Sequence, residues 1–285
     1  LLGALTGPLP PAMGYGLGRP VGALLLATSP QLRRILTCNF SHVLGPSASE
    51  EEVQALVRRA CANIIKGHYD LFRLSRLCNE EILAMTRVEG REHLDRALAR
   101  GKGVILFSAH FGNVDILIQV PLAFGVPLST PVEHVQPERL FQYTLRLRTS
   151  HGLRMYPTGG PMMGLYRALK RGEVIGLAAD RGIDVSTRKV EFFGEPASLP
   201  EGPVRLALRT GAALVPGSGL RLSDNSFLAR IEPALELQQT GDHEADVAAG
   251  MAMVADVLER IISQQPDQWL LAKPVWPMNG LDGTP

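Results

Sequence analysis

Four short apolar runs, separated by helical patterns, constrain the fold of this chain more than any other feature. The runs cover residues 103–107, 126–132, 174–179 and 212–218. They are nearly free of charged residues, which is typical of strands that are buried on both faces. Strands that alternate with helices in this way predict an α/β fold. We expect a mostly parallel central sheet with helices on both faces.

Two further segments precede the first apolar run. Ser49–Glu52 has the pattern of a capping box, and the residues after it repeat at helical spacing, so a long amphipathic helix is expected there. Residues 1–46 are instead rich in Gly, Pro, Leu and Ala, and their only charged residues are Arg19, Arg33 and Arg34. We expect residues 1–46 to form an apolar helical extension that packs on the main domain and contacts a membrane surface. Residues 47–285 are expected to form one catalytic domain.

Composition excludes several classes of function. The formal net charge is +1, which gives no argument for nucleic-acid binding. The three cysteines form no CxxC pair and have no histidine at zinc-ligand spacing, so free thiols and no metal site are expected. The apolar stretch before Gly18 contains several prolines, and a membrane-spanning helix tolerates such breakers poorly.

A histidine and an aspartate follow the first apolar run, in the stretch Phe107–Asp115. Neutral imidazole can accept a proton near pH 7, and a carboxylate on its far nitrogen would fix the tautomer. His110 lies in the turn, and Asp115 lies one helical turn later, where it can face back. The spacing alone is a weak signal, and a histidine that merely caps the helix is the alternative.

The nucleophile of this chemistry is not evident in the protein itself. No GxSxG nucleophile elbow is present, because Gly217-Ser218-Gly219 lacks the spacing, and no cysteine lies near His110 in sequence. A histidine base without a protein nucleophile suits direct attack by a substrate hydroxyl. Asp180 and Arg181 end the third apolar run, where ligands bind in parallel sheets. Arg148 is expected to meet a phosphate of donor or acceptor, with a solvated helix face as the alternative.

Four ordered blocks resemble a known family. They are Ser108–Asp115, Val132–Phe141, Gly176–Arg181 with Val190–Ala197, and Pro200–Leu208 through Gly211–Pro216. Trp269–Leu271 is weakly similar too. The blocks resemble the HX4D acyltransferases of the lysophospholipid acyltransferase superfamily and, within it, the late acyltransferases of lipid A biosynthesis. They most resemble the mycobacterial phosphatidylinositol mannoside acyltransferases. Val114-Asp115 departs from the Trp-Glu that is usual in lipid A enzymes, which weakens a specifically lipid A assignment.

The resemblance implies a glycerolipid-acyltransferase-like fold and an O-acyltransferase. A fatty acyl group would move from acyl-CoA or acyl carrier protein to a hydroxyl of a membrane glycolipid or phospholipid, without a covalent intermediate. His110 would be the general base and Asp115 its partner, so Asp115→Asn should leave folding intact but lower turnover strongly. Glu133 would position either the acceptor or the histidine, and Asp180 and Arg181 would hold the polar head of the acceptor.

The same resemblance also implies the location of the protein and its cofactor requirement. No metal or cofactor is expected beyond the acyl-thioester co-substrate, and the expected location is the cytoplasmic face of the cell membrane, peripheral or N-terminally anchored. Two alternatives remain: an acyl-thioester hydrolase that delivers water, and a non-catalytic lipid-binding relative.

Overall fold

The computed structural model describes residues 7, 9–158, 163–182 and 186–278. Within these ranges, seven strands form one sheet in the order β1-β9-β8-β2-β5-β3-β4. Their bounds are β1 Thr86–Glu89, β2 Val104–Ser108, β3 Leu128–Val132, β4 Arg154–Pro157, β5 Val174–Ala178, β8 Ala213–Arg221 and β9 Phe227–Ile231. All neighbouring pairs are parallel except β8 and β9. The predicted mostly parallel α/β sheet is confirmed.

The four apolar runs became β2, β3, β5 and β8, and alternate residues of β2 face opposite sides of the sheet. Ile105 and Phe107 pack in the main core with helices α12 (Gly202–Thr210) and α13 (His243–Gln264). Val104 packs in a second core with α7 (Arg91–Leu98). The first four residues of β2 are all apolar because helices cover both faces of the sheet.

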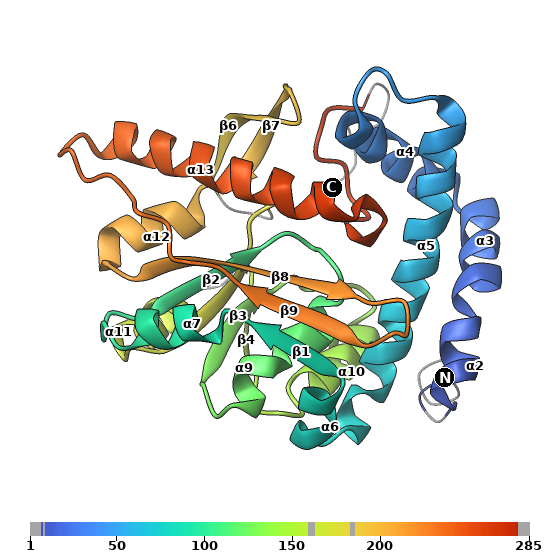
Figure 1. Cartoon of the computed structure of the whole chain (residues 1–285), viewed down its shortest axis with the longest axis horizontal. Coiled ribbons are helices and arrows are strands. Elements are labelled where there is room, and N and C mark those ends of the chain that lie inside the picture. The colour runs from blue at the N-terminus through green and yellow to red at the C-terminus, as the bar shows by residue number, and fades with distance from the viewer. Residues whose placement is uncertain (1–6, 8, 159–162, 183–185, 279–285) are drawn as a thin grey trace.

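The remaining elements surround this sheet (Figure 1). The other helices are α2 Pro11–Gly16, α3 Gly18–Thr28, α4 Pro30–Leu44, α5 Glu50–Arg73, α6 Asn79–Ala84, α8 Val114–Leu117, α9 Gln119–Ala123, α10 Glu138–Arg148 and α11 Met163–Lys170. Single 3-10 turns are η1 Leu74–Arg76 and η2 Pro266–Gln268. A separate hairpin pairs β6 (Thr187–Phe192) with β7 (Glu195–Pro200).

Helix α5 begins with the predicted capping box. The Ser49 hydroxyl accepts from the Glu52 N–H at 3.2 Å, and the Glu52 carboxylate accepts from the Ser49 N–H at 2.8 Å. These bonds satisfy two of the backbone donors that a helix start leaves without partners. The helix then runs past the end of the sheet, with α2 and α3 on its outer side (Figure 1).

Helix α3 lies very close to α5. A Cβ atom on Gly22 would stand 3.0 Å from the backbone nitrogen of Ala62, so a larger residue would force the helices apart. The Cys61 thiol donates to the Gly22 carbonyl at 3.3 Å across the same contact. Among the helices of the described ranges, none combines the length and the apolar character that crossing a bilayer requires.

Candidate active site

The register of two neighbouring strands brings His110 and Asp180 together. Ser108 of β2 pairs with Ala178 of β5 in a parallel ladder, and the Ala179 N–H still donates to the Ser108 carbonyl at 2.8 Å. His110 and Asp180 each lie two residues beyond that last pair. Carboxyl ends of parallel strands share one edge of the sheet, so the two side chains meet there.

Three hydrogen bonds hold the Asp180 carboxylate. His110 Nδ1 lies 2.8 Å from Oδ1, while the His110 backbone N–H and the Trp269 indole N–H each donate to Oδ2 at 2.8 Å. Asp180 is fully buried, whereas the His110 side chain is 33% exposed. A carboxylate can only accept from Nδ1, so the proton resides on Nδ1 and the lone pair on Nε2. Among the described residues, Nε2 has no hydrogen-bond partner.

The two ionisable groups shift each other's pKa. Burial lowers the pKa of His110, but the charge and hydrogen bond of Asp180 outweigh it, and the net shift is upward. Burial raises the pKa of Asp180, but the charge and hydrogen bond of His110, with the indole bond of Trp269, make the net shift downward. Arg181 and Arg148 partly oppose the rise at His110, so both guanidinium groups act on the imidazole electrostatically.

Asp115, the partner expected for His110, contacts Arg148 instead. Arg148 Nε lies 2.7 Å from Asp115 Oδ1, and Nη2 lies 3.4 Å from Oδ2. The charge of Asp115 raises the pKa of Arg148. No hydrogen bond joins Asp115 to His110 in the described part of the chain. The expected contact between His110 and Asp115 is therefore corrected. Asp180, which was predicted to bind the acceptor, contacts Nδ1 of His110, because it follows β5 beside β2. Asp115 lies in α8 and contacts Arg148 of α10 instead.

Glu133 and Arg181 form a second ion pair at the same edge of the sheet. Arg181 donates to the two Glu133 carboxylate oxygens at 3.1 and 3.3 Å, and both side chains are partly exposed. β3 ends at Val132 and lies beside β5, which brings the pair together. The six predicted site residues thus fall into three contacts, namely His110–Asp180, Asp115–Arg148 and Glu133–Arg181.

The turn after His110 is fixed against the C-terminal segment. Gly112 has φ +67°, and a Cβ there would lie 1.8 Å from the Gly219 carbonyl oxygen, so only glycine fits. The Gly112 N–H donates to the Gln268 carbonyl, and the Leu270 N–H donates to the His110 carbonyl, both at 2.8 Å. The turn is therefore pinned on both sides of His110.

Sequence reasoning missed the part that Trp269 plays. Trp269 is 1% exposed, and its indole N–H reaches Asp180 across 89 residues of chain. The one available signal was general, since a buried tryptophan needs a partner for its N–H. The weak similarity of Trp269–Leu271 to the family did not indicate that Asp180 is the group that accepts this N–H.

Replacing Trp269 with phenylalanine is expected to lower the activity of this site about tenfold. Phenylalanine keeps an aromatic ring but removes a donor to a buried carboxylate, and such charge-assisted bonds contribute roughly 1.5–3 kcal/mol. Trp276→Phe is the matched control, because Trp276 is also buried and its indole N–H has no partner among the described residues. Turnover of both variants checks the prediction; equal losses in the two would contradict it.

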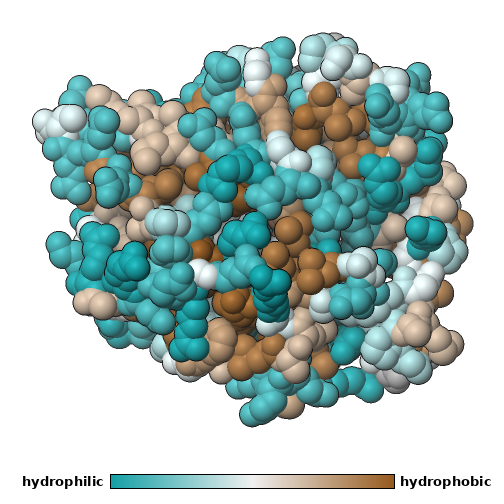
Figure 2. Space-filling view, in the orientation of Figure 1, coloured by the Kyte–Doolittle hydropathy of each residue, from teal (hydrophilic) through white to brown (hydrophobic). Residues whose placement is uncertain are grey.

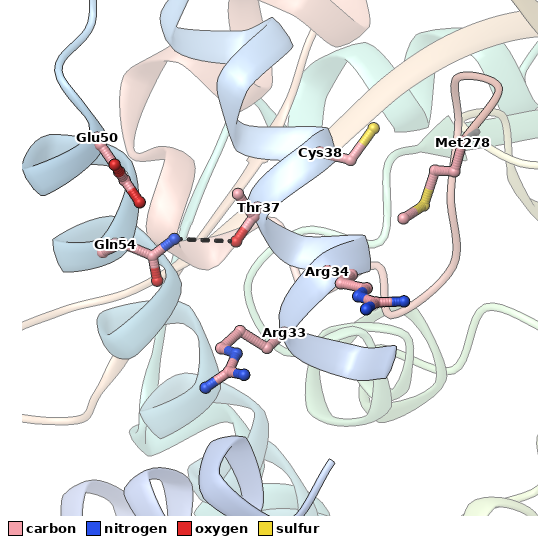
Figure 3. Close-up of a pocket in the computed structure, with 7 residues that line it drawn as sticks. All are labelled: Arg33, Arg34, Thr37, Cys38, Glu50, Gln54 and Met278. Carbon is pink, nitrogen blue, oxygen red and sulfur yellow. Dashed lines mark hydrogen bonds between the residues drawn. The ribbon is translucent and has the colours of Figure 1, made fainter. Parts of the chain in front are cut away.

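Two surface hollows lie away from this site. One hollow of about 500 Å³ is lined by Arg33, Arg34, Thr37, Cys38, Glu50, Gln54 and Met278 (Figure 3). Gln54 donates to Thr37 within it at 3.2 Å, and it contains no histidine. A second, of about 470 Å³, lies between the β6–β7 hairpin and α13. Neither contains a residue of the three contacts.

Comparison with known proteins identifies the family. The family model described as bacterial lipid A biosynthesis acyltransferase matches residues 2–277. Phosphatidylinositol mannoside acyltransferase of Mycobacterium tuberculosis is 31% identical over 257 residues, which are 86% of this chain and 76% of that protein. The enzyme of the same name from Mycolicibacterium smegmatis is 30% identical over 251 residues, 86% and 79% of the two chains.

A lipid A enzyme is similar as well. Lipid A biosynthesis lauroyltransferase of Escherichia coli is 26% identical over 269 residues, which are 92% of this chain and 84% of that protein. The resemblance that four sequence blocks indicated is confirmed over nearly the whole chain. The chain belongs to the bacterial lipid A biosynthesis acyltransferase family.

Proposed function

We propose that this chain is an O-acyltransferase that moves a fatty acyl group from an acyl thioester to a hydroxyl of a membrane glycolipid or phospholipid. The donor is acyl-CoA or acyl carrier protein, and the acceptor resembles phosphatidylinositol mannoside or lipid A. One observation supports this proposal for a member of an acyltransferase family. Asp180 binds Nδ1 of His110 at 2.8 Å, and no group in the described part of the chain pairs with Nε2.

The reaction is a single displacement. Nε2 of His110 takes the proton of the acceptor hydroxyl while the oxygen attacks the thioester carbonyl. The C–O bond forms, the C–S bond breaks, and the imidazolium returns its proton to the leaving thiolate. Asp180 stabilises the imidazolium and keeps Nε2 basic. No acyl-enzyme forms, because the acceptor itself is the nucleophile.

Two arginines are proposed to stabilise the negative charge of the oxyanion or of an acceptor phosphate. Arg148 and Arg181 both act on His110 through their charge, and each is held by one carboxylate, Asp115 or Glu133. The Asp115 and Ile116 N–H groups at the start of α8 already donate to Asn113 Oδ1. Guanidinium groups are therefore better placed than those amides to contact the oxyanion or an acceptor phosphate.

An apolar face of the N-terminal extension supports membrane contact. Met13 of α2, Val21 and Leu24 of α3, and Leu17 between the two helices are exposed and recur at helical spacing. In the space-filling view, the edge where α2 and α3 lie is largely pale or tan, broken by few hydrophilic residues (Figure 2). We assign residues 1–46 to this contact and residues 47–285 to catalysis, at the cytoplasmic face of the cell membrane.

A direct assay tests the proposal. Purified protein is mixed with palmitoyl-CoA and vesicles, with or without phosphatidylinositol mannoside, and both thiol release and acylated lipid are measured. Thiol release is expected to need the acceptor and to match the acylated lipid formed. Full release without acceptor would make the protein a thioester hydrolase instead.

The pH dependence of transfer follows from the pKa shifts. His110 must be neutral to act as a base, and Asp180 raises its pKa above the ordinary 6.5. The rise of kcat/KM with pH is therefore expected to have a midpoint above 6.5, since this limb reports the base of the free enzyme. A kcat/KM profile from about pH 5 to about pH 9 measures it. A midpoint below the ordinary value would contradict the His110–Asp180 pair.

A further inference from the structure

A buried polar cluster lies behind the catalytic turn and has no part in the mechanism above. Its centre is Asp70 of α5, whose side chain is 0% exposed. The Tyr15 hydroxyl donates to one carboxylate oxygen and the Asn113 amide donates to the other, each at 2.7 Å. Arg221 of β8 forms a buried ion pair with that second oxygen. Asp70 thus joins α2, the catalytic turn and the sheet.

Asn113 connects the cluster to the catalytic residues. Its side-chain oxygen accepts from the Asp115 and Ile116 N–H groups at 3.1 and 3.3 Å, which caps α8. Its amide nitrogen is turned to Asp70. Asn113 lies three positions after His110, so the carboxylate that fixes its amide also fixes the turn. If Asn113 shifted together with α8, its side-chain oxygen could still cap the helix, but the bond to Asp70 would be lost and the turn would move.

Tyr15 connects the cluster to the surface. Its ring packs edge-on against Tyr69 with centroids 5.1 Å apart, and the Arg221 guanidinium lies 5.1 Å above it. The neighbouring residues Met13 and Leu17 are exposed. Helix α2 and the residue that follows it therefore carry exposed apolar side chains, while Tyr15 of the same helix is hydrogen-bonded to buried Asp70. If Tyr15 withdraws, Asp70 is left in the interior with one donor fewer beside a buried arginine, which is an unfavourable arrangement.

We propose that Asp70 is a positioning residue for the His110 turn. Through the Tyr15 bond to Asp70, the turn keeps its active arrangement only while α2 is packed in place. The inference rests on the proposed function, because it concerns the same site. Tyr15 and Asn113 bind opposite oxygens of one carboxylate. Loss of the Tyr15 bond frees the carboxylate to rotate toward Arg221, and the Asn113 bond then lengthens. Contact of α2 with lipid is by this route coupled to turnover.

Two tyrosine variants test the coupling. Tyr15→Phe keeps the ring and removes the bond to Asp70. Tyr69→Phe is the matched control: its hydroxyl donates at 2.7 Å to the Leu9 carbonyl, on the same side of α5, and does not touch Asp70. Tyr15→Phe also loses the longer 3.4 Å bond that Arg73 of α5 donates to the Tyr15 hydroxyl, whereas Tyr69→Phe loses only the bond to Leu9. A purely structural role predicts a loss of melting temperature in both variants and similar activities.

The first readout needs no substrate. The His110 Nδ1 proton is followed by NMR through its exchange rate with water, well below the melting transition of each variant. Exchange is expected to be faster in Tyr15→Phe and unchanged in Tyr69→Phe. Asn113→Ser should resemble Tyr15→Phe, because serine still caps a helix but cannot carry the amide to Asp70. Wild-type exchange in both Tyr15→Phe and Asn113→Ser, or equally faster exchange in Tyr69→Phe, would overturn the proposal.

The second readout is kinetic. With palmitoyl-CoA and acceptor vesicles, kcat of Tyr15→Phe is expected to fall about ten- to a hundredfold with KM for the donor unchanged, as for a misplaced catalytic group. Tyr69→Phe should keep the wild-type kcat. If the wild-type protein transferred no acyl group, only the proposed function would be refuted. The exchange measurement would still test whether Asp70 positions the turn.

Discussion

His110→Gln is expected to lower the rate of acyl transfer about 10²–10⁴-fold in a protein that remains folded. Glutamine retains an amide that can donate to Asp180, so the turn keeps a partner for the buried carboxylate. It offers no group that accepts a proton near neutral pH. Transfer from palmitoyl-CoA to vesicle acceptor at saturating substrate measures the loss, and circular dichroism checks the fold.

His134→Gln is the matched control for this change. His134 follows β3 near the same edge of the sheet, but its side chain is 42% exposed and pairs with Glu138 on the surface. Its replacement should leave the rate within a factor of about two, as for a surface substitution away from packed groups. A wild-type rate for His110→Gln would reject His110 as the base.

Asp180→Asn is expected to lower the rate by as much as 10⁴-fold, about the loss that a wrong histidine tautomer causes in a serine-protease triad. Two N–H groups, from Trp269 and the His110 backbone, point at Oδ2. They will hold the amide oxygen of the asparagine there, so its NH₂ must face His110 Nδ1. That forces Nδ1 to accept and moves the proton to Nε2, where the base is needed.

Asp115→Asn distinguishes the observed His110–Asp180 pair from the His110–Asp115 pair that the sequence spacing suggested. Asp115 contacts Arg148 and not His110, so its replacement should weaken the hold on Arg148 and raise KM more than it lowers kcat. The steady-state constants of both variants are compared with those of the wild type. A large fall in kcat for Asp115→Asn, with little change for Asp180→Asn, would restore the His110–Asp115 pair.

The architecture around the site was predictable because its signals are local. An apolar run bounded by turns already indicates a strand buried on both faces, and β2, β3, β5 and β8 follow from that rule. The capping box at Ser49 is equally local. The edge strand β1, Thr86–Glu89, was not predicted, because a short strand with alternating charge has no apolar run to reveal it.

The pairing within the site was not predictable, because it depends on which strands are neighbours. Five positions separate His110 from Asp115, and helical spacing makes that pair plausible. Asp180 is 70 positions away and reaches His110 only because β5 lies beside β2 in the sheet. Trp269 is a further 89 positions along the chain. The sequence placed His110 and Asp180 at strand ends, but strand order is a property of the whole fold.

The protonation of the His110 ring in the resting wild-type protein tests the central claim most directly. With ¹⁵N-labelled histidine, the two ring nitrogens are resolved by NMR at a pH above the raised pKa of His110. The Asp180 contact predicts a proton on Nδ1 and an unprotonated, basic Nε2. A neutral ring that carries its proton on Nε2 would contradict the account, because His110 could then not take a proton from an acceptor hydroxyl.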